Sequence, residues 1–119
     1  MAKDTTNKKP ADFLDRIVTV KIDRPINSKH DKFDMIYELN YGFVPDTLAP
    51  DGEEIDAYVL GIDKPISEFV GRCSAIIHRA NDNDDKLVVV PDGLNFSDEE
   101  IRAKVDFQEK WFESKIIRK

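Results

Sequence analysis

Alternation of apolar and polar residues predicts that this chain is built mainly from short strands. Residues 16–22 alternate with a period of two and end at Asp23-Arg24-Pro25, which is typical of a half-buried strand. Residues 86–90 form a β-branched run that Pro91 closes, and the acidic turn at 81–85 predicts a hairpin with the preceding strand. The predicted strands cover residues 16–22, 35–39, 55–61, 69–77 and 86–90.

Glycine and proline residues add detail to these strands. Gly42 and Pro45 follow the predicted second strand and are expected to punctuate the chain there. Gly71 lies inside the predicted fourth strand, where a bend or bulge is expected. In the third strand the period of two predicts one face with Ile55, Ala57 and Val59 and another with Asp56 and Tyr58.

The C-terminal part of the chain predicts a helix. Ser97 and Glu100 have the spacing of a capping box, which marks a helix N-terminus. Apolar residues follow at helical spacing and are expected to pack on the core: Ile101, Val105, Phe107, Trp111, Phe112 and Ile116. Five short strands and one helix predict a mainly β fold, a five-stranded OB-like barrel with a C-terminal α-helix.

The length of 119 residues suits one domain with one core. We expect residues 1–12 to form a flexible N-terminal tail, because the start of the chain is polar and aperiodic, and residues 13–119 to form a single barrel domain. The start lacks the apolar stretch of a secretory signal, and no run approaches a membrane span. A single cysteine, Cys73, excludes an internal disulfide framework. The expected location is the cytoplasm, with no membrane partner.

The net charge of the chain helps to decide which classes of molecule it binds. A net charge of -6 argues against nucleic acid, because proteins that bind it usually carry a basic field. An anionic substrate stays open, since bound cations invert the local field. Barrel analogy alone suggests an oligonucleotide-binding module, but the strands lack interleaved arginine and aromatic residues. A homo-oligomer is left open.

Two acidic segments carry the candidate chemistry. Residues 51–56 hold four carboxylates and one glycine. Hard cations such as Mg²⁺ prefer oxygen ligands, and a substrate phosphate supplies further oxygens. A solvated acidic loop is the alternative, but a second acidic turn favours a metal–phosphate site with the two turns facing each other across a barrel mouth. The second turn contains Asp82, Asp84 and Asp85, followed by Lys86.

Three motifs, in matching order and spacing, resemble those of the soluble (family I) inorganic pyrophosphatases. Asp51-Gly52-Glu53-Glu54-Ile55-Asp56-Ala57 is similar to the family's acidic signature. Asn40-Tyr41-Gly42-Phe43-Val44 resembles its Asn-Tyr-Gly-aromatic segment, and residues 84–91 resemble its Asp-x-Lys strand. The family is an OB-type barrel that hydrolyses pyrophosphate to two phosphates with Mg²⁺. The resemblance therefore implies that fold, that reaction, Mg²⁺, and pyrophosphate or a related phosphoanhydride as substrate.

The resemblance also implies roles for single residues. Glu53 replaces the family's middle aspartate, which orients or deprotonates the attacking water, and is the implied catalytic residue. The implied phosphate contacts are Tyr41, Lys86 and Lys29, the last standing where the family has an arginine and supplying charge without the bidentate fork. The implied metal ligands are Asp51, Asp56 and Asp84, with Asp82 as a companion from the same turn.

The chain departs from the family in several places. It is shorter, and it lacks the hairpin that follows the first strand. The family's first-strand glutamate has no counterpart, since Lys21 and Asp23 flank the expected place. Glu53 is one methylene longer than aspartate, and a shift of about an ångström can cost roughly a hundredfold in rate. We expect a Mg²⁺-dependent pyrophosphatase with reduced activity; the alternative is a catalytically impaired domain that binds a metal–phosphate ligand or a protein partner.

Overall fold

The computed structural model describes residues 9–32, 34–47, 52–80 and 84–119. It begins with a 3-10 helix, Pro10–Phe13, in which Pro10 and Phe13 are buried. This helix overlaps the last residues of the predicted tail, most of which lies outside the described residues. The strands and the helix that follow are β1 (Ile17–Arg24), β2 (Asn40–Val44), β3 (Ile55–Val59), β4 (Glu68–Arg79), β5 (Asp84–Val90), α1 (Asp98–Glu109) and β6 (Ser114–Ile117).

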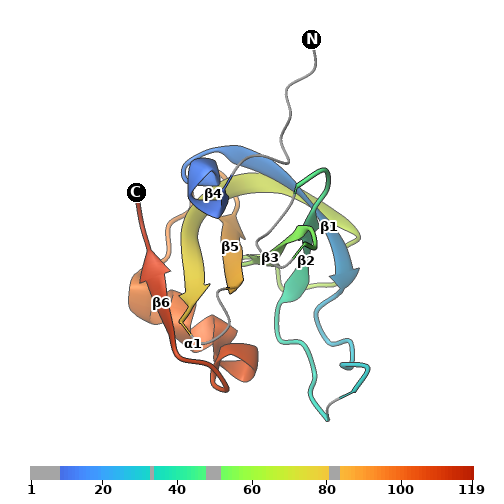
Figure 1. Cartoon of the computed structure of the whole chain (residues 1–119). Helices are drawn as coiled ribbons and strands as arrows, with labels where there is room; N and C mark the ends of the chain where they lie inside the picture. The colour runs from blue at the N-terminus through green and yellow to red at the C-terminus, as the bar shows by residue number, and fades with distance from the viewer. Residues whose placement is uncertain (1–8, 33, 48–51, 81–83) are drawn as a thin grey trace.

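Five of these strands close into a barrel (Figure 1). Neighbouring strands follow the order β1-β2-β3-β5-β4, and β1 also pairs with β4 to complete the ring. The pairs are antiparallel except β3 and β5, which run parallel with Asp56 opposite Lys86. The structure thus confirms the predicted five-stranded, OB-like barrel with a C-terminal helix.

Apolar side chains form two layers, one inside the barrel and one outside it. Val20, Ala57 and Leu87 are fully buried in the interior. On the outer face, Tyr58 and Val88 pack in the same cluster as residues of α1. Because side chains alternate along a strand, β3 sends Ile55, Ala57 and Val59 inward and Tyr58 toward α1, as its sequence pattern predicts.

Helix α1 begins as predicted but ends early. The Ser97 hydroxyl accepts a hydrogen bond from the Glu100 amide at 3.1 Å, and the Glu100 carboxylate accepts one from the Ser97 amide at 2.8 Å. The helix ends at Glu109, so the expected helical stripe through Phe112 and Ile116 is wrong. Trp111 was expected in the core, yet it is 71% exposed.

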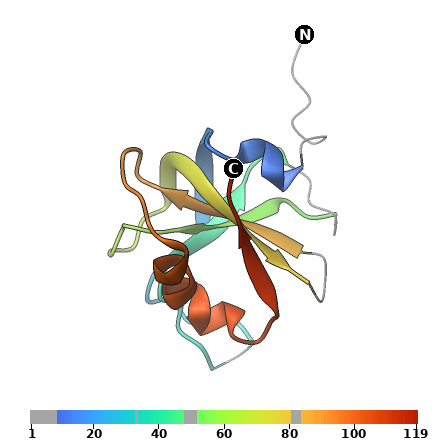
Figure 2. The same cartoon turned by 90° about the vertical axis from the view of Figure 1, so that its left-hand side faces the viewer.

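The residues after α1 form a strand that local periodicity did not predict. β6 pairs antiparallel with the end of β4, with Ile116 opposite Ile77. The start of β4 pairs with β1, so this long strand joins the barrel at one end and carries β6 at the other. Figures 1 and 2 show α1 lying close to β6 and the end of β4. β6 forms by pairing with the free backbone N–H and C=O groups at the end of β4, and a local sequence pattern does not show where such an unpaired strand edge lies.

The second strand lies later in the chain than predicted. Residues 35–39 form only an isolated bridge, between Ile36 and Lys29, and Tyr37 and Leu39 are buried in the layer beside α1. The strand proper is Asn40–Val44. A Cβ on Gly42 would lie 1.8 Å from the Lys21 carbonyl oxygen. Gly42 therefore does not end a strand but lets β1 and β2 approach each other closely.

The bulge in β4 lies between Cys73 and Ala75 rather than at Gly71. Gly71 has a different reason to be glycine, because a Cβ there would lie 2.4 Å from the Val90 carbonyl oxygen and 2.4 Å from the Phe69 ring. Both glycines thus mark places where the closing barrel leaves no room for a side chain.

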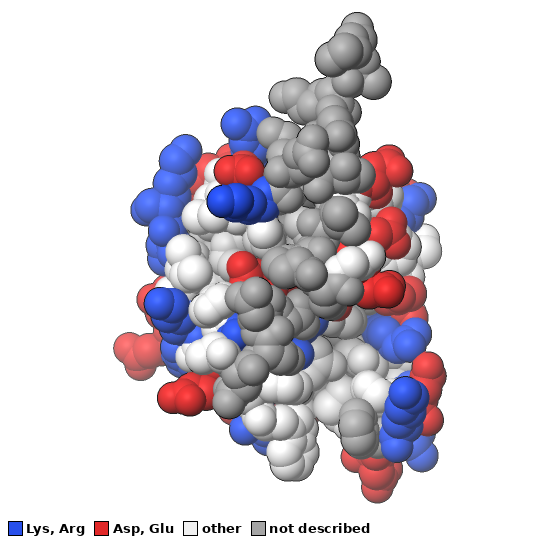
Figure 3. Space-filling model, viewed as in Figure 1, with Lys and Arg blue, Asp and Glu red and all other residues white. Residues whose placement is uncertain are grey.

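Charged side chains of both signs are intermixed on the face of the molecule shown in Figure 3. The net charge of -6 is therefore not gathered into a single acidic field on that face. In the described part of the chain, no helix has the length and apolar character needed to cross a membrane.

Candidate functional site

Asp56, Lys86 and Tyr41 meet on the outer face of the barrel, at neighbouring positions of three adjacent strands. The parallel register of β3 and β5 places Asp56 beside Lys86, and the Lys86 ammonium donates to Asp56 Oδ2 at 3.0 Å. The Tyr41 hydroxyl, from β2, donates to the same oxygen at 3.0 Å. The Lys86 side chain is only 4% exposed, whereas that of Asp56 is 39% exposed. A buried cation and a phenol thus hold a carboxylate that still reaches solvent.

Electrostatics keep Tyr41 protonated in this arrangement. Burial raises its pKa well above the ordinary value of 10.0, and the neighbouring Asp56 carboxylate raises the pKa further. The Lys86 ammonium also lies 5.5 Å from the centroid of the Tyr41 ring, within reach of a cation–π interaction. Tyr41 is therefore a fixed hydrogen-bond donor at any physiological pH.

A second carboxylate, Asp23, lies near Asp56. The β1–β2 register shifts between Ile22 and Arg24, so Asp23 is the extra residue of a bulge. Burial raises the pKa of Asp23 above 3.8, Arg24 opposes this, and the charge of Asp56 adds to the rise. The two carboxylates are therefore close enough for the charge of one to affect the protonation of the other. The sequence analysis placed Asp23 beside the missing glutamate without choosing it, because a bulge is not visible in a sequence pattern.

The oxygen donors on this face suit a hard divalent cation. The two hydrogen bonds that hold Asp56 both go to Oδ2, and the side chain as a whole is 39% exposed. The described side chains alone contain no group of three or more potential ligands of the His, Cys, Asp or Glu type. Asp51 and Asp82 lie outside the described residues. Asp84 begins β5, two positions before Lys86, and only its backbone is described.

Two further predicted residues, Glu53 and Lys29, have described side chains, and both are exposed. Glu53 is exposed in the loop that leads into β3. Lys29 is also exposed, and its ammonium lies 3.9 Å from a carboxylate oxygen of Asp34. No contact recorded among the described residues joins Lys29 to Asp56 or Lys86. Of the five predicted residues whose side chains are described, Asp56, Lys86 and Tyr41 lie together.

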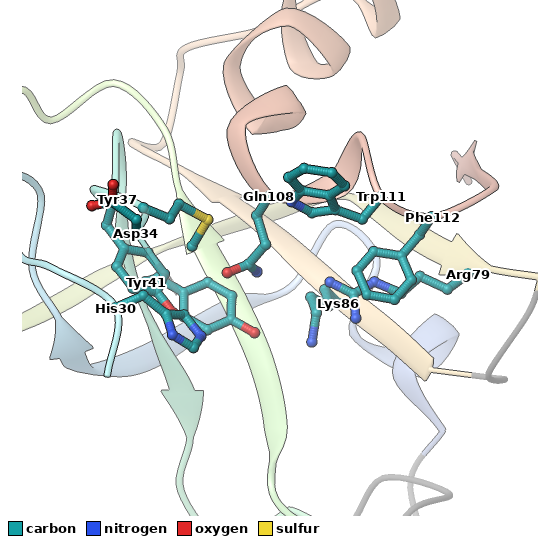
Figure 4. A pocket seen from close by; sticks show the side chains of 10 residues that line it. His30, Asp34, Tyr37, Tyr41, Arg79, Lys86, Gln108, Trp111 and Phe112 are labelled. Carbon is teal, nitrogen blue, oxygen red and sulfur yellow. The ribbon is translucent and has the colours of Figure 1, made fainter. Parts of the chain in front are cut away.

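A pocket of about 610 Å³ opens beside Lys86 and Tyr41. One side comes from the segment before β2 and from β2 itself, and the other comes from the end of α1 and from Arg79 at the end of β4 (Figure 4). Lys86 and Gln108 lie between the two sides. The lining residues are His30, Asp34, Met35, Tyr37, Tyr41, Arg79, Lys86, Gln108, Trp111 and Phe112.

A buried ionic network supports the helix side of the pocket. The Arg79 guanidinium donates to both Glu109 oxygens, at 3.0 and 2.7 Å, and both side chains are at least nine-tenths buried. Glu109 also accepts a hydrogen bond from the Tyr58 hydroxyl at 2.6 Å, and that hydroxyl accepts one from Gln108 at 2.7 Å. The sequence analysis missed this network, because Arg79 and Glu109 are thirty residues apart and match no motif.

Comparisons with known proteins agree on one family. A profile of the inorganic pyrophosphatases matches residues 19–116. The inorganic pyrophosphatase of Aeropyrum pernix is 31% identical over 102 residues, which cover 69% of this chain and 58% of that protein. The one from Rickettsia prowazekii is 36% identical over 61 residues, 48% of this chain and 36% of that protein. The chain thus matches about a third of the Rickettsia protein.

Solved structures show the same fold. The crystal structure of the inorganic pyrophosphatase from Ehrlichia chaffeensis matches with a TM-score of 0.67 and 22% identity, over 94% of this chain and 92% of that one. The one from Thermus thermophilus gives a TM-score of 0.57 and 20% identity, over 97% of this chain and 88% of that one. Because the family profile matches residues 19–116, which is most of the chain, the chain belongs to the inorganic pyrophosphatase family.

Proposed function

We propose that this chain hydrolyses inorganic pyrophosphate to two phosphates in a reaction that depends on Mg²⁺. The observation that carries the proposal is the convergence of Asp56, Lys86 and Tyr41 on one outer patch of the barrel, two of them donating to a single carboxylate oxygen. Membership of the family supports the same reaction. Phosphoryl transfer asks the protein mainly to position groups and to stabilise charge, which such a patch can do.

Lys86 and Tyr41 are the proposed phosphate contacts. The Lys86 ammonium has three N–H donors, one of which Asp56 accepts. Its burial strengthens the attraction between the ammonium and a phosphate oxygen, because the surroundings are poorly solvated. Tyr41 stays protonated, and its single O–H, which Asp56 accepts in this structure, would turn to a phosphate oxygen when the substrate binds. Lys29 would add charge from the periphery, where it is exposed.

Mg²⁺ is the proposed cofactor, held by Asp56 together with Asp51, Asp82 and Asp84. Carboxylate oxygens are the ligands that this cation prefers, and the Asp56 side chain is 39% exposed. When bound, the cation neutralises charge on the phosphates and makes water a stronger nucleophile. Glu53 is the proposed residue that orients the attacking water or accepts its proton.

The cytoplasm is the proposed location. The sole cysteine, Cys73, is buried, and burial raises the pKa of its thiol to about 12. A buried free thiol that forms no disulfide suits a reducing compartment. A homo-oligomer stays a prediction.

The proposal is tested by measuring phosphate release from pyrophosphate with the wild-type chain, in Mg²⁺ and in a chelator. We expect release that saturates with both pyrophosphate and Mg²⁺ and that stops in the chelator. Binding of Mg²⁺ and pyrophosphate without phosphate release would instead favour the impaired binding domain. A chain that neither binds nor hydrolyses pyrophosphate would contradict both interpretations.

A further inference from the structure

The pocket beside Lys86 is larger and more aromatic than pyrophosphate needs. Pyrophosphate is a small anion with no apolar surface, and it gains nothing from contact with aromatic rings. A volume of about 610 Å³ lies in the range of roughly 300–1,000 Å³ that is usual for organic ligands. Most of the wall is formed by rings and by the Met35 thioether. The charged groups thus account for one end of the pocket and leave the other end unexplained.

Trp111 is the lining residue of the pocket that pyrophosphate binding explains least. It is the only tryptophan of the chain, and it is 71% exposed although it lines the pocket. Exposed aromatic rings beside a cavity are typical of binding surfaces, because the ring loses its contact with water only when a ligand covers it. Trp111 and Tyr37 lie on opposite sides of the pocket (Figure 4), and both line it.

The helix side of the pocket is held rigidly. The Arg79 guanidinium carbon lies 3.7 Å from the centroid of the Phe112 ring, and Arg79 is itself fixed by its two hydrogen bonds to Glu109. Gln108 reaches between the two sides, where its amide group can pair with the polar edge of a ligand (Figure 4). A rigid wall loses little entropy on binding, which favours affinity.

We infer that the pocket binds the base of a nucleoside diphosphate whose phosphates lie at Lys86 and Asp56. This inference rests on the proposed function, because it uses the same phosphate site and names a substrate class for it. A nucleobase combines a planar ring, which stacks on an aromatic side chain, with a polar edge that suits Gln108. The diphosphate supplies the anionic end that suits Lys86.

The same reaction applies to such a substrate. The oxygen of a water molecule bonds to the terminal phosphorus while the bond between that phosphorus and the bridging oxygen breaks. The nucleoside monophosphate leaves with the bridging oxygen, and the water gives up one proton to solvent. The products are therefore a nucleoside monophosphate and inorganic phosphate, and no further reactant is needed.

The single tryptophan gives a direct readout. The methylene-bridged analogue of ADP, which the proposed reaction does not cleave, is titrated with Mg²⁺ into the chain, and methylenediphosphonate replaces pyrophosphate in this titration and in the calorimetry below. The emission of Trp111 is followed with excitation at wavelengths that adenine does not absorb. We expect a saturable quench that pyrophosphate alone does not produce and that excess pyrophosphate reverses, because the two ligands share the phosphate end. If ADP changes the emission no more than pyrophosphate does, the inference is wrong.

A pair of variants tests the stacking contact by calorimetry. Trp111→Ala should lower the ratio of ADP affinity to pyrophosphate affinity about tenfold, since base stacking contributes roughly 1–3 kcal/mol. Leu94→Ala removes another exposed apolar side chain, one that does not line the pocket, and it should leave the ratio unchanged. An unchanged ratio in Trp111→Ala would overturn the inference.

The inference and the proposed function can fail separately. Selective ADP binding without pyrophosphate hydrolysis would support the inference and contradict the proposed function. Pyrophosphate hydrolysis without ADP binding would support the proposed function and overturn the inference.

Discussion

At the scale of single residues, Asp56 contacts both proposed phosphate-binding residues, Lys86 and Tyr41, and is itself a proposed metal ligand. One of its oxygens is committed to Lys86 and Tyr41, and the side chain is still 39% exposed. A carboxylate held by two hydrogen bonds loses less side-chain entropy when it binds a cation than a freely rotating one does. The hydrogen bonds to Oδ2 thus position the group that is proposed to bind the metal.

Lys86→Met should weaken substrate binding. The variant keeps the buried aliphatic stem but removes the ammonium, and a hydrogen bond to a charged group contributes roughly 1.5–3 kcal/mol. We expect kcat/KM for pyrophosphate to fall at least about tenfold, measured by phosphate release. Lys104→Met, on the exposed surface of α1, serves as the matched control. Equal activity in both variants would remove Lys86 from the site.

Cys73 should be chemically silent while the chain is folded. Its pKa rises from 9.0 to about 12, chiefly through burial, so the thiolate fraction near neutral pH is about a thousandfold lower than for a free thiol. The folded chain should react with a thiol reagent far more slowly than the chain in urea. Because the pKa is raised on folding, this group's contribution to stability is complete below pH 9.0 and is lost as the pH rises toward 12. Rapid labelling of the native chain would contradict the burial of Cys73.

Among single residues, the sequence identified those that belong to a motif and missed those that depend on the fold. Tyr41, Asp56 and Lys86 were found because each lies in a short motif with fixed spacing. Asp23 and Arg79 were not chosen. The first is placed by a bulge and the second by a partner on a distant helix.

At the scale of elements, β1 and β2 leave no room for a side chain at Gly42. Gly42→Ala would place a Cβ 1.8 Å from a backbone oxygen, which no side-chain movement relieves. We expect the free energy of unfolding in urea to fall by about 4 kcal/mol or more. Gly93→Ala is the control, because it meets only open space and a positive φ, and should cost about 1 kcal/mol. Similar costs for the two variants would argue against this strand pairing.

The Arg79–Glu109 pair should determine how firmly α1 is attached to the barrel. Glu109→Ala leaves the buried guanidinium of Arg79 without its carboxylate, and breaking such a pair typically costs about 3–5 kcal/mol. Urea unfolding should show that loss, whereas Glu99→Ala at the exposed start of α1 should cost less than about 1 kcal/mol. A small effect of Glu109→Ala would mean that the pair is solvated in solution.

The sequence predicted an element well where periodicity alone defines it. β1, β3, β4, β5 and the start of α1 lie close to their predicted positions. Residues 35–39 misled the prediction because they are apolar at strand-like spacing yet bury Tyr37 and Leu39 beside α1. β6 was missed because Ile116 also fits the helical period, and only pairing with β4 distinguishes the two.

At the scale of the whole molecule, the parallel pairing of β3 and β5 builds the site. It places Asp56 and Lys86 side by side, although they are thirty residues apart in the chain. The prediction that two acidic turns face each other across a barrel mouth stays a prediction, because Asp51 and residues 81–83 lie outside the described residues. Among the described residues, Asp56, Lys86 and Tyr41 meet on the outer face of the barrel, beside the pocket and α1. The order of the strands in the sheet places them there, and local sequence patterns do not predict that order.

The most direct test of the account is phosphate release from pyrophosphate in Mg²⁺ by Asp56→Asn, compared with the wild-type chain and with Asp63→Asn. Asp63 is an exposed aspartate in the turn after β3, so the same substitution there controls for the lost charge. We predict that Asp56→Asn lowers kcat/KM at least about a hundredfold while Asp63→Asn stays within about twofold of the wild type. Wild-type kcat/KM in a folded Asp56→Asn chain would contradict the assignment of hydrolysis to this face of the barrel.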